Sequence, residues 1–207
     1  MKKGFRNKKL WGLLALLLCV SLAAPAVNVQ AASKKSQAIK AYKNFLAGKP
    51  NNGSYDFAMI YLDNDSVPEL LVGAFLYTFK DGKVTQHSVV FGDSGCSYYK
   101  KKGVIVTLHT HNNVIYKEGM QGSDYYKFTK SKLTRKLYKE CVYKINSSGK
   151  TVGKKKYSYS RYNSKNMQVK TTKAKFDSAL KQMAGKKKPV KIKMHRNTKA
   201  NRNKYLK

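Results

Sequence analysis

The sequence predicts an α+β domain in which an antiparallel β meander of hairpins has an N-terminal helix and a C-terminal helix packed on it. Apolar residues recur at helical spacing near both ends of the chain. Between them, a phrase of aromatic residues, a lysine, a polar turn and an apolar residue recurs at positions 77, 97, 124 and 142. Together these patterns favour successive hairpins enclosed by two helices.

Residues 1–32 have the three parts of a secretory signal peptide: a basic start, an apolar run over 10–26 and small residues at Ala31 and Ala32. A membrane anchor is the alternative, but the run contains Ser21 and Pro25 and is shorter than the roughly 20 residues that span a bilayer. We therefore expect a secreted, extracellular protein, with cell-envelope association as one form of it. Residues 33–207 are expected to form a single domain without a transmembrane segment.

The N-terminal helix is expected over 33–47, because Ile39, Tyr42 and Phe45 or Leu46 recur on one face. Gly48 and a following proline end this pattern. Near the other end, Thr172 can cap a helix whose Phe176, Leu180 and Met183 lie at i, i+4 and i+7, and Gly185 closes it.

Residues 57–62 (FAMIYL) and 69–79 (ELLVGAFLYTF) read as two strands joined by an acidic turn. The second is apolar almost throughout and is expected to be a central strand buried on both faces. Asp81-Gly82 predicts a tight hairpin turn after it, and Asn112-Asn113 predicts another between two strands.

The acidic turn contains three carboxylates in nine residues, Asp63, Asp65 and Glu69, which make it a candidate calcium site. Alternate side chains of a tight loop converge on its centre, where Ca²⁺ takes six to eight oxygen ligands. Without a metal, Asp63 and Asp65 would instead accept hydrogen bonds from the loop's own backbone N–H groups.

The turn YLDNDSVPEL resembles the calcium loops D-x-D-x-D-G-x-x-[DE] of FG-GAP-type repeats and degenerate EF-hand-like segments, with Tyr61 in place of the first carboxylate and Ser66 in place of the glycine. The wider layout is similar to that of small secreted proteins of Gram-positive anaerobes that share a D-x-D-x-x-P-E-L turn. In this chain that turn and the ending from Asn197 to Leu206 carry the resemblance. It implies a fold and an exported location, and no activity.

Two cysteines follow the signal, Cys96 and Cys141. An even number in an oxidising compartment predicts a disulfide, which would enclose a loop of about 45 residues and stabilise the fold by roughly 4 kcal/mol. Two unrelated buried thiols are the alternative.

Positive charge is concentrated in the second half of the chain. Residues 33–124 carry 11 Lys and Arg against eight Asp and Glu, whereas residues 125–207 carry 27 against two, a net charge of +25. Such a surface attracts polyanions, and because lysine dominates, the attraction is expected to be poorly selective. A solvated, solubilising surface is the alternative.

The leading hypothesis is a cationic, non-enzymatic protein that binds anionic polymers: teichoic acid, sulfated glycan, nucleic acid or anionic lipid. The C-terminal segment is the expected contact, through Lys186, Lys187, Lys188, Lys191, Lys193, Arg196, Lys199 and Arg202. A secreted enzyme such as a hydrolase, with a site built from His87, His109 or His111 and a carboxylate, is the second hypothesis. A host-directed or membrane-active effector is the third.

Overall fold

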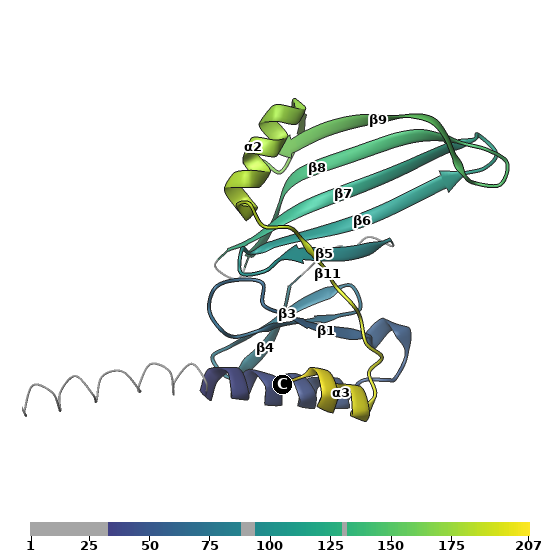
Figure 1. Ribbon diagram of the computed structural model, residues 1–207. Coiled ribbons are helices and arrows are strands. Elements are labelled where there is room, and N and C mark those ends of the chain that lie inside the picture. The colour runs from purple at the N-terminus through teal and green to yellow at the C-terminus, as the bar shows by residue number, and fades with distance from the viewer. Residues whose placement is uncertain (1–32, 88–93, 130–131) are drawn as a thin grey trace, which may run out of the picture.

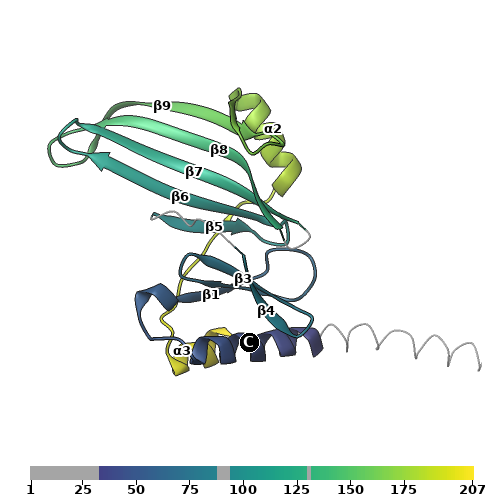
Figure 2. The same ribbon diagram turned by 180° about the vertical axis from the view of Figure 1, so that it is seen from behind.

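The computed structural model describes residues 33–87, 94–129 and 132–207. The fold is α+β, as the sequence predicts, with two antiparallel sheets and helices toward both ends of the chain (Figures 1 and 2). The predicted signal peptide lies outside the described residues. No helix in the described part of the chain is long and apolar enough to cross a membrane.

The small sheet has four strands in the order β1-β2-β3-β4: β1 (Phe57–Ile60), β2 (Glu69–Val72), β3 (Phe75–Lys80) and β4 (Lys83–His87). A short 3₁₀ helix, η1 (Gly53–Tyr55), precedes it. All four residues of β2 are buried, in agreement with the predicted central strand. The prediction of one strand over 69–79 is wrong, because the chain turns back at Gly73. This residue has φ 54°, and a Cβ there would lie 2.4 Å from the carbonyl oxygen of Ser54.

The hairpin turn predicted at Asp81-Gly82 is confirmed. Asp81 and Gly82 have φ of 50° and 78°, the positive values that a two-residue turn of this kind requires. The turn joins β3 to β4, and β4 forms the outer edge of the small sheet.

The N-terminal helix, described over residues 33–47, covers one face of the small sheet (Figure 1). Its Ala38, Tyr42 and Leu46 lie at i, i+4 and i+8 and are completely buried against strand residues such as Phe57 and Leu70. The helix predicted for these residues is therefore confirmed.

The large sheet has seven strands in the order β10-β9-β8-β7-β6-β5-β11. Their bounds are β5 (Gly95–Tyr99), β6 (Val104–Asn113), β7 (Glu118–Thr129), β8 (Lys132–Ile145), β9 (Thr151–Tyr162), β10 (Gln168–Lys170) and β11 (Val190–Lys191). The turn predicted at Asn112-Asn113 lies further along the chain: these residues pair with Gly119 and Glu118, so residues 114–117 form the turn. The segment VIYK was expected to be a strand and is the turn itself.

Helix α2 (Lys173–Ala184) packs on one face of the large sheet, with Thr172 as its N-cap and Gly185 as its C-cap, as predicted. Phe176 contacts the rings of Tyr125 and Tyr159 from this helix. The opposite face of the large sheet packs on the small sheet through a shared core. From the large sheet, Tyr98, Ile105 and Phe128 enter it; from the small-sheet side, Ala58, Ile60, Leu62, Leu71 and Leu76 do so.

The strap, residues 186–198, connects α2 to the small sheet and helix α3 (Lys199–Tyr205). It adds β11 to the edge of β5, and His195 pairs with Phe57 through two backbone hydrogen bonds of 2.8 Å. The end of the chain then returns to the N-terminal helix: Leu206 is fully buried in the same core as Tyr42. The two ends of the described chain therefore lie side by side (Figure 1).

Candidate functional site

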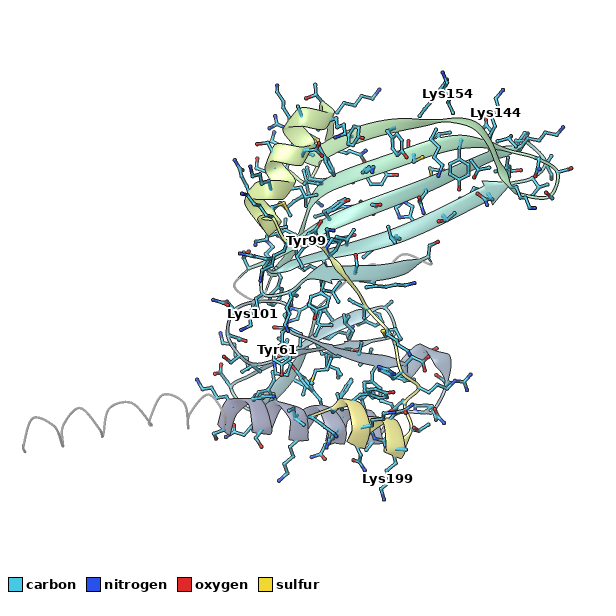
Figure 3. The ribbon with its side chains drawn as sticks, in the orientation of Figure 1. Tyr61, Tyr99, Lys101, Lys144, Lys154 and Lys199 are labelled. Carbon is cyan, nitrogen blue, oxygen red and sulfur yellow. The ribbon has the colours of Figure 1, made fainter. Side chains whose placement is uncertain are left out.

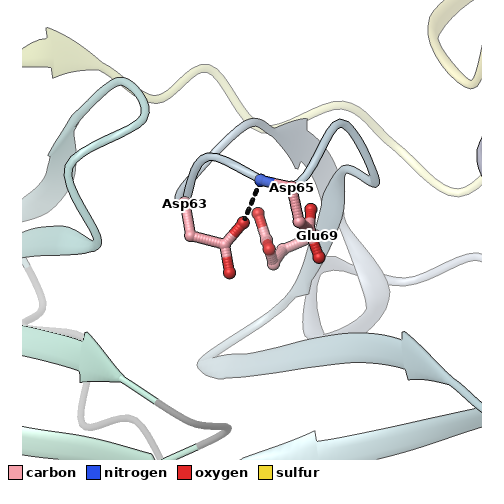
Figure 4. A group of neighbouring side chains, drawn as sticks. All are labelled: Asp63, Asp65 and Glu69. Carbon is pink, nitrogen blue, oxygen red and sulfur yellow. Dashed lines mark hydrogen bonds between the residues drawn. The ribbon is translucent and has the colours of Figure 1, made fainter. Parts of the chain in front are cut away.

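The three carboxylates of the acidic turn converge, as the sequence predicts. Asp63 and Asp65 lie in the loop between β1 and β2, and Glu69 is the first residue of β2. One oxygen from each side chain lies within 4.8 Å of the others (Figure 4). This cluster could hold a metal ion, and an all-oxygen ligand set suits a hard cation.

The carboxylates of this loop also accept hydrogen bonds from backbone N–H groups of the same loop. Asp63 Oδ1 accepts from the backbone N–H of Asp65 at 3.1 Å, and Asp65 Oδ1 accepts from that of Val67 at 2.9 Å. These are the Asx-type turns that the sequence offered as the metal-free alternative. Ser66 has φ 68°, so it adopts the left-handed conformation for which the calcium loops that this turn resembles use glycine. The backbone oxygen of Tyr61, which stands at the first ligand position, accepts instead from Lys101 N–H at 2.9 Å.

Burial makes this cluster electrostatically unusual. Glu69 is 3 % exposed, and burial raises the pKa of its carboxyl to about 8, helped by the nearby charges of Asp63 and Asp65. The hydrogen bond that Leu62 N–H donates to Glu69 Oε2, at 2.8 Å, opposes this increase in pKa only in part. Asp65 is exposed, but partial desolvation by the surrounding loop raises the pKa of its carboxyl to about 6, with the nearby Asp63 adding to it. A bound cation would favour the ionised carboxylates against both their desolvation and their mutual repulsion.

A cavity of about 270 Å³ adjoins the cluster. The three carboxylates line one part of it, and Thr78, Phe79 and Phe128 line another. Phe128 belongs to β7 of the large sheet, so the cavity lies where the two sheets meet.

The basic residues predicted to bind polyanions lie along the strap and α3. Seven of them are exposed: Lys186, Lys187, Lys188, Lys191, Lys193, Arg196 and Lys199. Arg202 has a structural role, because its Nη1 donates to Asn197 Oδ1 at 2.8 Å and to the Asn197 backbone oxygen at 3.3 Å. This pair closes the turn into α3, so Arg202 is a weaker candidate for binding.

A second cationic region, which the sequence reasoning did not single out, lies where α2 meets the edge of the large sheet. Arg161, Lys170 and Lys175 line a cavity of about 430 Å³ together with Thr171 and Thr172, and no carboxylate lines it. These residues come from β9, β10 and the first turn of α2. The run Lys154, Lys155 and Lys156 continues the exposed basic surface along β9, as Figure 3 shows at Lys154.

The carboxylates of this half of the chain already have partners. Asp177 pairs with Lys173 at 2.6 Å, and Glu140 accepts a hydrogen bond from the Tyr138 hydroxyl at 2.9 Å. Among the described residues from 125 onward, Arg135 and Lys173 are the only basic residues that have a described carboxylate within 4.0 Å. The remaining lysines and arginines are not neutralised within the described chain.

Within the described part of the chain, the histidines of the enzyme hypothesis do not assemble around a free carboxylate. His109 Nδ1 lies 3.8 Å from Asp124 Oδ2, but Arg135 binds both oxygens of Asp124, at 2.7 and 2.5 Å. Such a bidentate ion pair has a structural role here, because it leaves neither oxygen of Asp124 free for His109. His87 bonds Thr78 Oγ1 at 2.8 Å instead, and burial lowers its pKa.

The predicted disulfide is not formed. Cys96 and Cys141 are free thiols on β5 and β8, and two strands, β6 and β7, lie between them. Three strand spacings of about 4.8 Å separate such positions by far more than the 7 Å or so that a bridge tolerates. The alternative of two unrelated thiols is therefore correct.

No family model, characterised protein or solved structure matches this chain.

Proposed function

We propose that the protein is a secreted, non-enzymatic binding protein that associates with anionic polymers of the cell envelope or a host surface through its lysine-rich half. The observation that carries this proposal is the unpaired charge described above. Residues 125–207 hold 27 Lys and Arg against Glu140 and Asp177, and both of these carboxylates are already engaged. Excess charge that is not neutralised internally attracts an external polyanion.

The shape of the cationic surface supports a polymer rather than a small anion. Its exposed lysines extend from β9, across α2, and along the strap to α3. A teichoic acid, sulfated glycan or nucleic acid presents charge along a line and can contact such a surface at many points. The cavity around Arg161, Lys170 and Lys175 offers one place where three cations approach a single phosphate or sulfate group.

We further propose that Ca²⁺ binds Asp63, Asp65 and Glu69 and stabilises the junction of the two sheets. The converging oxygens, the glycine-like conformation of Ser66 and the raised pKa values of Asp65 and Glu69 support this assignment. Calcium would then have a structural role, separate from that of the polyanion surface.

The polyanion proposal is tested by salt elution from heparin and teichoic-acid resins. We expect strong retention that falls steeply with salt, because each phosphate or sulfate contact releases about one counterion. Replacing Arg161, Lys170 and Lys175 by Gln should lower the elution salt more than replacing Lys34, Lys40 and Lys83 by Gln, although both variants lose three charges. If the wild type elutes no later than a neutral control protein, the polyanion proposal is wrong. If the two variants lower the elution salt equally, the cavity around Arg161, Lys170 and Lys175 is not a preferred contact.

A further inference from the structure

The turn between β6 and β7 exposes three consecutive apolar or aromatic side chains, which we call the apolar tip. Val114 is 47 % exposed, Ile115 87 % and Tyr116 74 %. Turns of this kind usually consist of polar residues and glycine, as the neighbouring turn at 146–150 does with Asn146 and Gly149. Single exposed apolar residues need no explanation, but a contiguous group marks an interaction site.

The tip is held in place by its own backbone. Asn113 Oδ1 accepts from Tyr116 N–H at 3.1 Å, and the Val114 backbone oxygen accepts from Lys117 N–H at 3.3 Å. The Lys117 oxygen in turn accepts from Ile145 N–H at 2.9 Å, which ties the turn to β8. The three side chains therefore project from a supported hairpin end.

The tip also stands at the extreme end of the large sheet. Figures 1 and 2 show the turns β6–β7 and β8–β9 together at the end opposite α2, away from the small sheet. Strands of 10 to 14 residues lead to this end. A flat surface can approach the two turns at this end without meeting α2 or the small sheet.

Basic residues surround the tip. The exposed Lys117, Lys144, Lys150 and Lys154 lie on the two turns and the strand ends beside them, and Glu118 is the nearby acidic residue in the described chain. Figure 3 shows Lys144 and Lys154 at this end of the sheet. An apolar hairpin end surrounded by lysines is complementary to a bilayer, which has an apolar interior beneath an anionic headgroup layer.

We propose that the apolar tip inserts into the surface of an anionic phospholipid bilayer while the surrounding lysines contact the headgroups. Ile115 enters the acyl boundary, and Tyr116 lies at the interface, where its ring is buried and its hydroxyl stays hydrated. Each lysine near the headgroups strengthens partitioning about fivefold at low salt. A protein partner fits less well, because three side chains at a hairpin end form too small an apolar contact for a stable protein interface.

This inference uses a different part of the surface from the polyanion proposal, and each can fail without the other. Ile115→Asp removes the most exposed apolar side chain and opposes anionic lipid, yet it leaves Arg161, Lys170 and Lys175 unchanged. We therefore expect the variant to elute from heparin close to the salt concentration of the wild type.

The experiment is cosedimentation of the exported protein, its N-terminus read by mass spectrometry, with vesicles of phosphatidylcholine alone and of phosphatidylcholine with 30 % phosphatidylglycerol. We expect binding to the anionic vesicles, with at least a tenfold loss of affinity in Ile115→Asp. Met167→Asp is the matched control, because Met167 is 56 % exposed in the β9–β10 turn near α2. It should bind as the wild type does.

Insertion is separated from simple adsorption by fluorescence. The tryptophan of Tyr116→Trp should shift its emission to the blue on anionic vesicles, whereas that of Met167→Trp should not. Equal binding by Ile115→Asp and the wild type, or no shift at position 116, would overturn the proposal. A wild type that self-associates without lipid, and becomes monomeric in Ile115→Asp, would assign the tip to contact between copies and would also overturn it.

Discussion

The small-sheet part and the large-sheet part of the molecule differ in how their charged residues are balanced and where they lie. Residues 33–87, which form the N-terminal helix and the small sheet, carry seven basic and five acidic side chains, and the acidic cluster lies beside the core. Residues 94–194, which form the large sheet, α2 and most of the strap, carry 26 basic and four acidic side chains. The first half is covered by helices on one face and by the large sheet on the other, whereas most of β9 is exposed.

This difference indicates that charged residues of the small-sheet part act on stability, whereas those of the large-sheet part are available for binding. Carboxylates placed near a core affect folding, because their ionisation state changes on burial. Lysines on exposed strands affect folding little and remain available to other molecules. The predictions below test whether the two halves share one core and whether the acidic cluster acts on that core.

The largest effect is expected from the shared core. Leu62 is fully buried between the sheets, and Leu62→Ala should lower the free energy of unfolding by about 2–5 kcal/mol. The measurement is chemical denaturation followed by near-UV and far-UV circular dichroism. Because both sheets bury residues in this cluster, the variant should unfold in one transition seen by both probes.

Val142→Ala is a suitable control, since Val142 is 38 % exposed on β8, and it should change the free energy by less than about 1 kcal/mol. Two separate transitions, of which Leu62→Ala moves only one, would show that the sheets fold independently.

Calcium is expected to have the next largest effect. At a concentration of 100 times its dissociation constant, Ca²⁺ should raise the free energy of unfolding by about 2.7 kcal/mol relative to chelator. Thermal melts with Ca²⁺ and with chelator measure this difference. Glu69→Gln should abolish it, while Asp81→Asn, a charge-matched change in an exposed turn, should preserve it. A wild type whose midpoint is identical in both buffers would retire the calcium assignment.

The pH dependence of stability in chelator should be opposite in sign to that of an ion-paired carboxylate. The pKa of Glu69 is raised to about 8 in the folded protein, so the folded state binds an extra proton above the unfolded pKa of 4.5. Its contribution to stability is fully present below the unfolded pKa and is lost as pH rises toward 8. The melting temperature should therefore fall between pH 5 and pH 8, with Asp65 adding to the lower part of this range.

Glu69→Gln provides the control for this slope, because the amide keeps an oxygen for the Leu62 N–H bond and does not titrate. The variant should show a clearly flatter profile over pH 5 to 8. A wild-type melting temperature that rises across this range would contradict the raised pKa of Glu69.

The smallest expected effect is that of a reductant. Cys96 and Cys141 are free thiols on strands that are not adjacent, so dithiothreitol should leave the melting temperature unchanged. A disulfide between them would instead contribute roughly 4 kcal/mol and would lower the midpoint markedly on reduction. Mass spectrometry after alkylation under non-reducing conditions should find both cysteines modified.

Local patterns in the sequence predicted the elements that depend on local physics. The faces of the N-terminal helix and α2, the cap at Thr172 and the turn at Asp81-Gly82 follow from spacing and backbone preference. The break at Gly73 was missed because glycine lies within an otherwise apolar run, and the close approach of Ser54 that requires it comes from tertiary structure. The turn at 114–117 was missed because Val, Ile and Tyr favour strands and are unusual in a turn.

The candidate site was predictable only in part, for the same reason. The spacing of Asp63, Asp65 and Glu69 indicated their convergence. Burial of Glu69 and the use of the Tyr61 carbonyl by Lys101 depend on how the two sheets meet. The cluster of Arg161, Lys170 and Lys175 joins three elements that only the fold brings together.

The contact between the first described helix and the C-terminal segment sets an order of events during biosynthesis. Asn197 Nδ2 donates to the backbone oxygens of Leu46 and Lys49 at 2.9 and 3.3 Å, so the last residues satisfy the end of the first described helix. Leu206 then fills the core beside Tyr42. During synthesis the N-terminal helix is made before Asn197 and Leu206, so its packing is completed only when the C-terminal segment has been made. A premature stop near residue 195 would leave that helix without these two partners.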